Sequence, residues 1–482
     1  MAYLKKSLGL SFATQYTEMA IQFLSVMILA RLITPEEVGI YSVAAFLMAV
    51  LQVFRDFGVG KYLISVEELT ADRIRSAYGV AIILAWIIAL FLLFAAPYVA
   101  DFYDEPRVAD ILMVMSASFA ITPLGSLLTS IFRRHMEFKK VLIVRITSSV
   151  CHVITAVSLA LYGLGALSLA WANFAGILAF GITALILRTP GTPYLPSFKN
   201  IREIFSFGSI SSLGNIATVF GTNGPDVIIG KAIDLAASGY FSRANGMVQM
   251  FRALISGAVG PIILPFFAQL RRDDGDVKQA YGLAIAYLTV IAWPFFIVIG
   301  LLSLPIIRVL YGTQWDVSAP VAQVLCAMGA VACLATFAGD VMIAHGKVGQ
   351  ATASQLLTQP VRVVAVLAAS PFGLTAIAIA LVIAECYTVA ITSRRLRLVT
   401  GVSFLNVLHA TRKSAIVTFG SAIAPAIVAF TFSGGEHAWL QLILGSGGAL
   451  IGWLASIALT NHPAQEHLHQ ARNWAIAKAR RS

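Results

Sequence analysis

The chain has 482 residues, of which 58% are hydrophobic and only 12% are charged. A soluble domain carries roughly 25% charged residues, so this composition excludes a soluble globular protein and indicates an integral membrane protein. The formal net charge of +11 would also suit nucleic-acid binding, and the positions of the basic residues decide between the two interpretations.

Apolar segments long enough to cross a bilayer as helices of about 20 residues follow one another along the chain. They cover 12–33, 38–57, 76–100, 109–132, 142–162, 164–187, 205–230, 240–268, 280–306, 318–343, 352–371, 373–392, 414–433 and 438–460. We therefore expect an all-α polytopic membrane protein with about 14 transmembrane helices. The first segment is expected to stay in the protein, because it is too long for a signal peptide and contains Glu18.

The basic residues are distributed unevenly over the predicted loops. An even number of spans returns both ends of the chain to one side, and with that side cytoplasmic most of the 34 Lys and Arg residues fall in inner loops and tails. This is the positive-inside pattern, so the basic balance requires no nucleic-acid partner. We expect a multi-pass protein with both termini in the cytoplasm.

Motifs for catalysis or metal binding are missing from the sequence. The predicted outer loops are short, and no phosphate-binding loop, HExxH motif or Ser/His/Asp set is present. The four cysteines lie inside predicted spans without a CxxC pair. The sequence therefore predicts a protein that is not an enzyme and holds no metal.

Two segments recur along the chain at similar spacing. ARLITPEEVGIYS, from Ala30 to Ser42, returns as GKAIDLAASGYFS, from Gly230 to Ser242, and YGLGALSLAWANFAG from Tyr162 returns as FGLTAIAIALVIAEC from Phe372. Spans 1–6 and 7–12 start in the same direction, so they are expected to form parallel, pseudo-symmetric six-helix lobes around a central cavity, an architecture typical of transporters. The predicted regions are lobes at 1–200 and 201–400, two further helices at 401–460 and a basic cytoplasmic tail at 461–482.

Five arginines lie inside the apolar segments. Arg252 and Arg362 are ten or more residues into their spans and near the middle of the bilayer, where a charge costs about 2.5–3.5 kcal/mol. Arg145 and Arg243 lie about one turn inside, and Arg55 lies near the cytoplasmic end of span 2. We expect these arginines to face a polar cavity and an anionic cargo, and the alternative for the two deep ones is a structural pair with Glu385.

The acidic and helix-loosening residues suggest further roles. Glu385 is the acid nearest the midplane and is the first candidate for proton or sodium coupling, before Asp226, Asp340 and Glu18. Span 8 also contains residues that loosen a helix and are candidates for a gate. These are Gly257, Gly260, Pro261 and Pro265.

Several short motifs together resemble a known family. They are Ala30-Arg31-Leu32-Ile33, Asp56-Phe57-Gly58, Glu137-Phe138-Lys139-Lys140, Asp226-Val227-Ile228-Ile229-Gly230-Lys231, Leu264-Pro265-Phe266-Phe267 and the stretch from Tyr311 to Cys326. Over about residues 1–400 the chain resembles the polysaccharide exporters and Wzx-type flippases of the multidrug/oligosaccharidyl-lipid/polysaccharide superfamily, in the branch of the colanic-acid exporters. It departs at Val38, where an aromatic residue is usual, and at Arg55, where the family often has a small polar residue.

The resemblance implies two six-helix lobes arranged in a V. It also implies that the chain transfers an undecaprenyl-pyrophosphate-linked oligosaccharide, such as an exopolysaccharide, capsule or O-antigen unit, across the bacterial inner membrane. The implied partners are this cargo, membrane lipids and a polysaccharide polymerase or export machinery. Arg55 would meet the pyrophosphate first, held by Asp56, because an arginine fork suits phosphate oxygens.

Two related functions stay open at this point. A lipid II-type flippase has the same fold, and the sequence does not separate its cargo from other lipid-linked glycans. An ion-coupled multidrug antiporter of the same superfamily usually has twelve spans and deep acids, whereas this chain has more deep arginines than deep acids.

Overall fold

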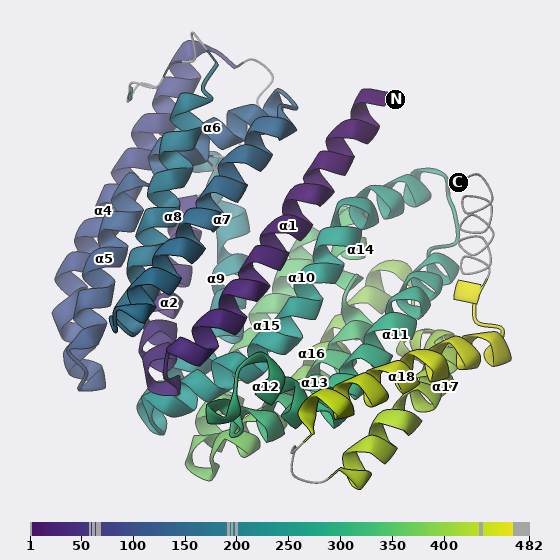
Figure 1. Ribbon diagram of the computed structural model, residues 1–482. Helices are drawn as coiled ribbons and strands as arrows, with labels where there is room; N and C mark the ends of the chain where they lie inside the picture. Colours follow the sequence, from purple (N-terminus) through teal and green to yellow (C-terminus); the bar gives the residue numbers. More distant parts are fainter. Residues whose placement is uncertain are drawn as a thin grey trace, which may run out of the picture. The chain divides into compact units, whose positions relative to one another are not determined.

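The computed structural model describes residues 2–56, 59, 63, 69–189, 193, 196–197, 201–432 and 437–465. Side chains are described over the same ranges except at 2–12, 56, 201–215, 256, 258 and 261. The described residues form 17 α-helices and three short 3₁₀ helices, which confirms the all-α prediction (Figure 1).

The contacts divide the chain into two compact units, Met1–Ser242 and Arg243–Ser482. The first unit contains the helices from α1 to the start of α10. Their bounds are α1 Ala2–Leu32, α2 Pro35–Asp56, α4 Ala71–Tyr103, α5 Arg107–Ile121, α6 Pro123–Arg134, α7 Phe138–Leu161, α8 Ala166–Ile186, α9 Ile201–Ala232 and α10 Leu235–Arg272.

The second unit contains the rest of α10 and all later helices. Their bounds are α11 Val277–Leu301, α12 Ser303–Leu310, η1 Thr313–Trp315, α13 Ser318–Ala332, η2 Cys333–Ala335, α14 Ala338–Ala344, α15 Val348–Ala369, η3 Ser370–Phe372, α16 Leu374–Thr400, α17 Phe404–Thr431 and α18 Ala438–Thr460. The lobe boundaries at residues 200 and 400 follow from the repeat and not from contacts, so they stay predictions.

Nine helices in the described part of the chain are long and apolar enough to cross a membrane, or ten if one bent pair is a single span. The protein is therefore a multi-pass membrane protein. Every predicted apolar segment overlaps a helix or a broken helix. The total of fourteen spans stays a prediction, because α1, α9, α10 and α15 are not among these nine.

The predicted span at 109–132 is broken into two helices. α5 ends at Ile121 and α6 begins at Pro123, and the two are bent by 46°. Proline has no N–H to donate to the preceding turn and its ring displaces the carbonyl there, so the helix changes direction at this residue. The segment predicted as one span is thus a bent pair of helices.

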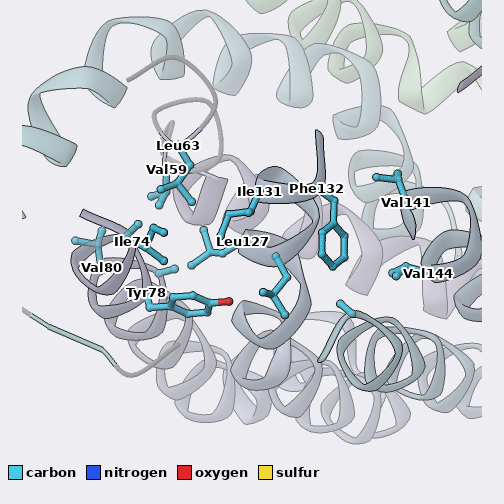
Figure 2. Close-up of a cluster of buried hydrophobic side chains, with 14 residues drawn as sticks. Val59, Leu63, Ile74, Tyr78, Val80, Leu127, Ile131, Phe132, Val141 and Val144 are labelled. Carbon is cyan, nitrogen blue, oxygen red and sulfur yellow. The ribbon is translucent and has the colours of Figure 1, made fainter. Parts of the chain in front are cut away.

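A cluster of buried apolar side chains holds α4, α6 and α7 together in the first unit (Figure 2). Phe132 belongs to this cluster and is only 1% exposed, and Lys140 Nζ lies 5.1 Å from the centre of its ring. Close packing of this aromatic ring stabilises the contact between the helices through van der Waals interactions. The cluster therefore fixes the ends of these helices near the bent pair.

The start of α2 meets the start of α10 at corresponding residues of the two repeats, all within the first unit. A Cβ atom on Gly39 would lie 1.7 Å from the backbone oxygen of Leu235, and one on Gly239 would lie 1.9 Å from that of Pro35. Ser42 Oγ and Ser242 Oγ are 3.2 Å apart. Only glycine leaves room for two helix backbones to approach this closely.

In the second unit α17 and α18 form a hairpin of adjacent helices (Figure 1). Small residues face each other along it, because a Cβ on Gly452 would lie 2.4 Å from Gly420 O and one on Gly448 would lie 2.3 Å from Ala424 Cβ. Trp453 Nε1 donates a 2.7 Å hydrogen bond to Val290 O, which ties the hairpin to α11.

The segment after α18 is fastened by His462, which is 1% exposed. Its Nδ1 accepts from the N–H of Ala464 at 3.1 Å, so Nε2 carries the proton and donates to Ser414 Oγ at 3.2 Å. Ser414 in turn donates to Ala286 O on α11. If Nδ1 were also protonated, two N–H donors would face each other and the hydrogen bond from Ala464 would be lost. This arrangement therefore requires the neutral imidazole.

We expect His462 to make stability depend on pH. Burial lowers its pKa, and the charge of Lys413 lowers it further. In the unfolded chain the histidine has its ordinary pKa of about 6.5. As the pH falls, the unfolded chain therefore binds the proton at a higher pH than the folded protein does. The stabilising contribution is complete above about pH 6.5 and is lost as the pH falls from there through the folded pKa. Thermal unfolding in detergent between pH 7.5 and 5 measures it.

The variant His462→Gln should show a smaller loss of unfolding temperature on acidification than the wild type. It should also be less stable at pH 7.5, because an unsatisfied buried polar group costs about 1–3 kcal/mol. His409→Gln is the matched control, since His409 is an exposed residue of α17. Equal pH dependence in wild type and His462→Gln would contradict the assignment.

Candidate functional site

A cavity of about 200 Å³ lies inside the first unit, between α2, α5 and α8. Its lining combines polar groups with apolar ones. The lining residues are Tyr41, Ala45, Met48, Ala49, Gln52, Arg55, Met115, Phe119, Thr122, Asn173 and Ile177. A polar cavity in an apolar bundle is the usual setting of a binding site in a membrane protein.

The helix α2 supplies one wall of this cavity through residues spaced three or four apart. Tyr41, Gln52 and Arg55 fall on this face with the small residues between them. The Arg55 guanidinium lies 5.6 Å from the centre of the Phe119 ring on α5, within the range of a cation–π contact. Arg55 therefore lies at the last turn of α2 and lines the cavity, and the side chain of Asp56 lies outside the described residues.

Asn173 on α8 lines the same cavity. Its Oδ1 is buried and accepts no hydrogen bond from any residue that the structure describes. A buried amide oxygen without a donor is costly, so a ligand or water is expected to supply one. Sequence reasoning missed Asn173, although it lies in the repeated segment YGLGALSLAWANFAG, and it missed Gln52 and Tyr41, which share the α2 spacing with Arg55.

In the second unit, Arg362 on α15 and Glu385 on α16 form an ion pair. Arg362 Nη1 lies 2.6 Å from Glu385 Oε2, and the two residues are 6% and 7% exposed. Arg362 Nη2 also approaches Met328 Sδ at 3.7 Å. The structural pair that the sequence left as an alternative for Arg362 is thus present, and it neutralises both charges.

Arg252 on α10 differs from Arg362. It is exposed, and it makes no hydrogen bond or ion pair with another described residue. Like Arg362, it belongs to the second unit. Because Glu385 already neutralises Arg362, Arg252 is the deep arginine whose charge is available to an anion.

The other two arginines have partners of their own. The guanidinium of Arg243 lies 5.2 Å from the ring centre of Trp315 and 6.0 Å from that of Tyr311, and both rings are buried. Arg145 Nη1 on α7 lies 2.9 Å from Glu18 Oε2 on α1. These contacts link helices within one unit in each case, so Arg243 and Arg145 contribute to the stability of their own units.

Among the acids, Asp226 stands apart from the paired Glu385 and Glu18. Its Oδ1 is buried without a hydrogen-bond donor in the described part of the chain, while its backbone oxygen accepts from Ser238 Oγ at 2.9 Å. Asp340 is half-buried on α14. No group of three or more His, Cys, Asp or Glu suited to a metal occurs among the described residues.

The residues proposed as a gate lie in a continuous helix. α10 runs from Leu235 to Arg272 through Gly257, Gly260, Pro261 and Pro265. A Cβ on Gly260 would meet no atom within 4 Å, and the side chain of Pro261 lies outside the described residues. Gating at this segment stays a prediction.

The family model described as "Polysaccharide biosynthesis protein" matches residues 28–320, more than half of the chain. The chain belongs to this family. The match covers α2, the cavity of the first unit and the segment of Tyr311 and Trp315, so the residues of the candidate site up to Arg252 lie inside the family region.

Several curated relatives of this chain are named as transport or biosynthesis proteins. The chain is 26% identical to the succinoglycan biosynthesis transport protein ExoT of Rhizobium meliloti over 326 residues. The aligned residues make up 66% of this chain and 65% of the relative. The chain is 19% identical to the lipopolysaccharide biosynthesis protein WzxC of Escherichia coli, over 67% and 66%, and 22% identical to the teichuronic acid biosynthesis protein TuaB of Bacillus subtilis, over 61% and 62%. The chain thus matches less than two thirds of each relative's length.

The fold of this chain is similar to that of two solved membrane proteins. The lipid II flippase MurJ in an inward closed conformation aligns with a TM-score of 0.72, at 14% identity, over 93% of this chain and 98% of that one. An inward-facing multidrug resistance transporter of the MATE family aligns with a TM-score of 0.59, at 11% identity, over 85% and 98%. At these identities the likeness concerns the fold alone.

Proposed function

We propose that this protein is an alternating-access flippase that moves an undecaprenyl-pyrophosphate-linked oligosaccharide from the cytoplasmic to the outer leaflet of the bacterial inner membrane. The family and the names of its relatives, which refer to succinoglycan, lipopolysaccharide and teichuronic acid, support this class of cargo. The observation that carries the proposal is the cavity of the first unit, where Arg55 and the buried Asn173 face one polar space.

The chemistry of the cavity suits the polar part of such a cargo. A guanidinium offers two parallel N–H donors to phosphate oxygens, which makes arginine the preferred residue for pyrophosphate. Asn173, Gln52 and Tyr41 offer donors and acceptors that fit sugar hydroxyls. Phe119 holds the Arg55 guanidinium by its ring and adds an apolar face against which a sugar ring packs.

The role of the five membrane arginines is therefore divided. Arg55 and Arg252 are proposed to bind the pyrophosphate, each in its own unit. Arg362 and Arg145 are proposed to stabilise the fold, because they form ion pairs with Glu385 and Glu18. Arg243 is proposed to do so through its contacts with two aromatic rings, and unlike Arg55 it does not line the cavity. This narrows the predicted set of cargo arginines from five to two.

For coupling to an ion we propose Asp226 in place of Glu385. A buried carboxylate without a donor is the group most easily protonated or bound to sodium, whereas Glu385 would first have to leave Arg362. The proposal retains fourteen spans, two six-helix lobes at 1–200 and 201–400, two helices at 401–460, cytoplasmic termini and a polymerase or export machinery as partner. Most of the tail at 461–482 lies outside the described residues.

We expect Arg55→Gln and Arg252→Gln each to slow transport by roughly 10-fold to 100-fold, because a charge-assisted hydrogen bond contributes about 1.5–3 kcal/mol. The measurement places a fluorescent polyprenyl-pyrophosphate oligosaccharide in one leaflet of a liposome and follows its appearance in the other. Arg272→Gln is the control, since Arg272 is an exposed arginine at the end of α10, and it should transport like the wild type.

If Arg55→Gln transports at the wild-type rate, the proposal that the cavity of the first unit binds the cargo is wrong. The same assay separates the two related functions. Lipid II as the only cargo moved would favour a lipid II-type flippase, for which the TM-score of 0.72 to MurJ is the supporting observation. Proton- or sodium-driven efflux of organic cations, with no lipid moved, would assign the chain to the multidrug antiporters.

A further inference from the structure

A groove of about 500 Å³ runs along α16 in the second unit. It is lined mainly by apolar atoms and has two arginines at one end. The lining residues are Val331, Leu334, Cys386, Val389, Ala390, Ser393, Arg394, Arg397 and Phe404. The groove shares no residue with the cavity of the first unit or with the Arg362–Glu385 pair.

The α16 residues of the groove form one face of the helix. Cys386, Ala390, Arg394 and Arg397 recur at intervals of three or four residues. From Cys386 to Arg397 the helix rises ~16 Å at 1.5 Å per residue, which is close to half of the roughly 30 Å thickness of the bilayer core. The groove therefore has the length of a single leaflet.

The surroundings of the groove are apolar and exposed. Ile383 is 66%, Leu398 is 76% and Leu405 is 75% exposed, and in a multi-pass membrane protein such a surface faces lipid. The arginines lie at the C-terminal end of α16, which the charge distribution predicts to be cytoplasmic. The groove thus opens to the leaflet that faces the cytoplasm.

The two groove arginines have no partner among the described residues. Arg394 and Arg397 are exposed and make no hydrogen bond or ion pair there, whereas Arg395 between them donates to Gln350 Oε1 at 2.5 Å. Cations in the last turns of a helix also complement its dipole and the positive-inside rule. Those two effects explain cations at this end of the helix, but they do not explain why both arginines lie at the end of an apolar groove. A bound anion with an apolar tail accounts for both features.

We propose that the groove binds an anionic phospholipid of the cytoplasmic leaflet. Its phosphate lies between Arg394 and Arg397, and one acyl chain follows α16 past Ala390 to Cys386, with Phe404 of α17 at the side. The lipid joins the end of α13, α16 and the start of α17. Because Glu385 precedes Cys386 on α16, the lipid lies against the helix that carries the Arg362 pair.

The test measures lipid retention on the purified full-length protein by native mass spectrometry, with cardiolipin and phosphatidylcholine titrated separately. Arg394→Gln/Arg397→Gln should weaken cardiolipin binding roughly tenfold or more, since each basic residue near an anionic lipid headgroup adds to its binding. Binding of phosphatidylcholine should not change. Ala390→Trp, which fills the groove, should reduce the retention of both lipids.

The control is Arg272→Gln/Lys347→Gln, which removes two exposed cations that do not line the groove and should bind cardiolipin like the wild type. Equal losses in the two double variants would show a general effect of charge and overturn the site. Equal retention of cardiolipin and phosphatidylcholine by the wild type would also overturn it. Displacement of cardiolipin by polyprenyl phosphate at a lower concentration would instead assign the groove to the tail of the cargo. Unfolding temperatures without added lipid verify that each variant is folded.

Discussion

Replacing Glu385 by alanine is expected to destabilise the protein by about 3–5 kcal/mol. The change removes the carboxylate that lies 2.6 Å from Arg362 Nη1 and leaves the guanidinium, 6% exposed, without a counter-charge. Water is excluded there, so nothing else in the pair's surroundings replaces the lost interaction. The free energy of unfolding, measured by titration of the folded protein with SDS in mixed micelles, reports the loss.

The matched control removes both charges. Arg362→Met/Glu385→Leu should recover most of the stability, because two apolar side chains of similar volume avoid the desolvation cost of the pair. It should also retain transport if Arg362 is structural. A stable double variant that binds no cargo would return Arg362 to the binding site, and a loss below 1 kcal/mol in Glu385→Ala would show that the pair is hydrated.

Alanine at Gly39 or Gly239 is expected to destabilise the first unit by about 3 kcal/mol, at the upper end of the usual cost of overpacking. The new Cβ would lie 1.7 Å from Leu235 O or 1.9 Å from Pro35 O, and a backbone oxygen in a helix cannot move aside alone. The helices α2 and α10 would have to separate. Gly246→Ala in α10 is the control, since its Cβ meets no atom within 4 Å and alanine favours a helix by about 0.5–1 kcal/mol.

The same contact offers a reversible test of movement. In Ser42→Cys/Ser242→Cys the two side chains start from oxygens 3.2 Å apart, so oxidation should join α2 to α10. Under the proposed alternating-access cycle we expect oxidation to stop transport and reduction to restore it, while the wild type under the same oxidant is unaffected. A crosslinked variant that transports at the full rate would show that this contact stays closed throughout the cycle.

The sequence predicted the all-helical membrane fold because a bilayer requires long apolar segments whatever their neighbours. The repeat aligned Gly39 with Gly239 but did not predict that α2 and α10 pack against each other at these residues. The sequence did not predict the break at Pro123, because proline is tolerated inside membrane helices and only packing decides whether one bends. α9, for example, continues through Pro225.

The candidate site was predicted by residue type and not by partner. Depth in a span singled out Arg362 and Glu385, and a position at the cytoplasmic end of an apolar segment singled out Arg55. The contacts of Arg243 with Trp315 and of Arg145 with Glu18 join residues far apart in the sequence, so no local pattern announced them. Asn173 is an ordinary polar residue in an apolar segment until the fold places it beside Arg55.

The ion pair between α1 and α7 has a consequence for biosynthesis. α1 carries Glu18 near its middle and is not among the described helices that qualify as membrane spans by themselves. A carboxylate inside an apolar segment opposes insertion into the bilayer, and its partner Arg145 is synthesised 127 residues later, roughly 6 to 25 s at usual rates of translation. The first helix therefore gains its stable place in the membrane only after α7 has emerged from the ribosome, and until then it depends on the insertion machinery.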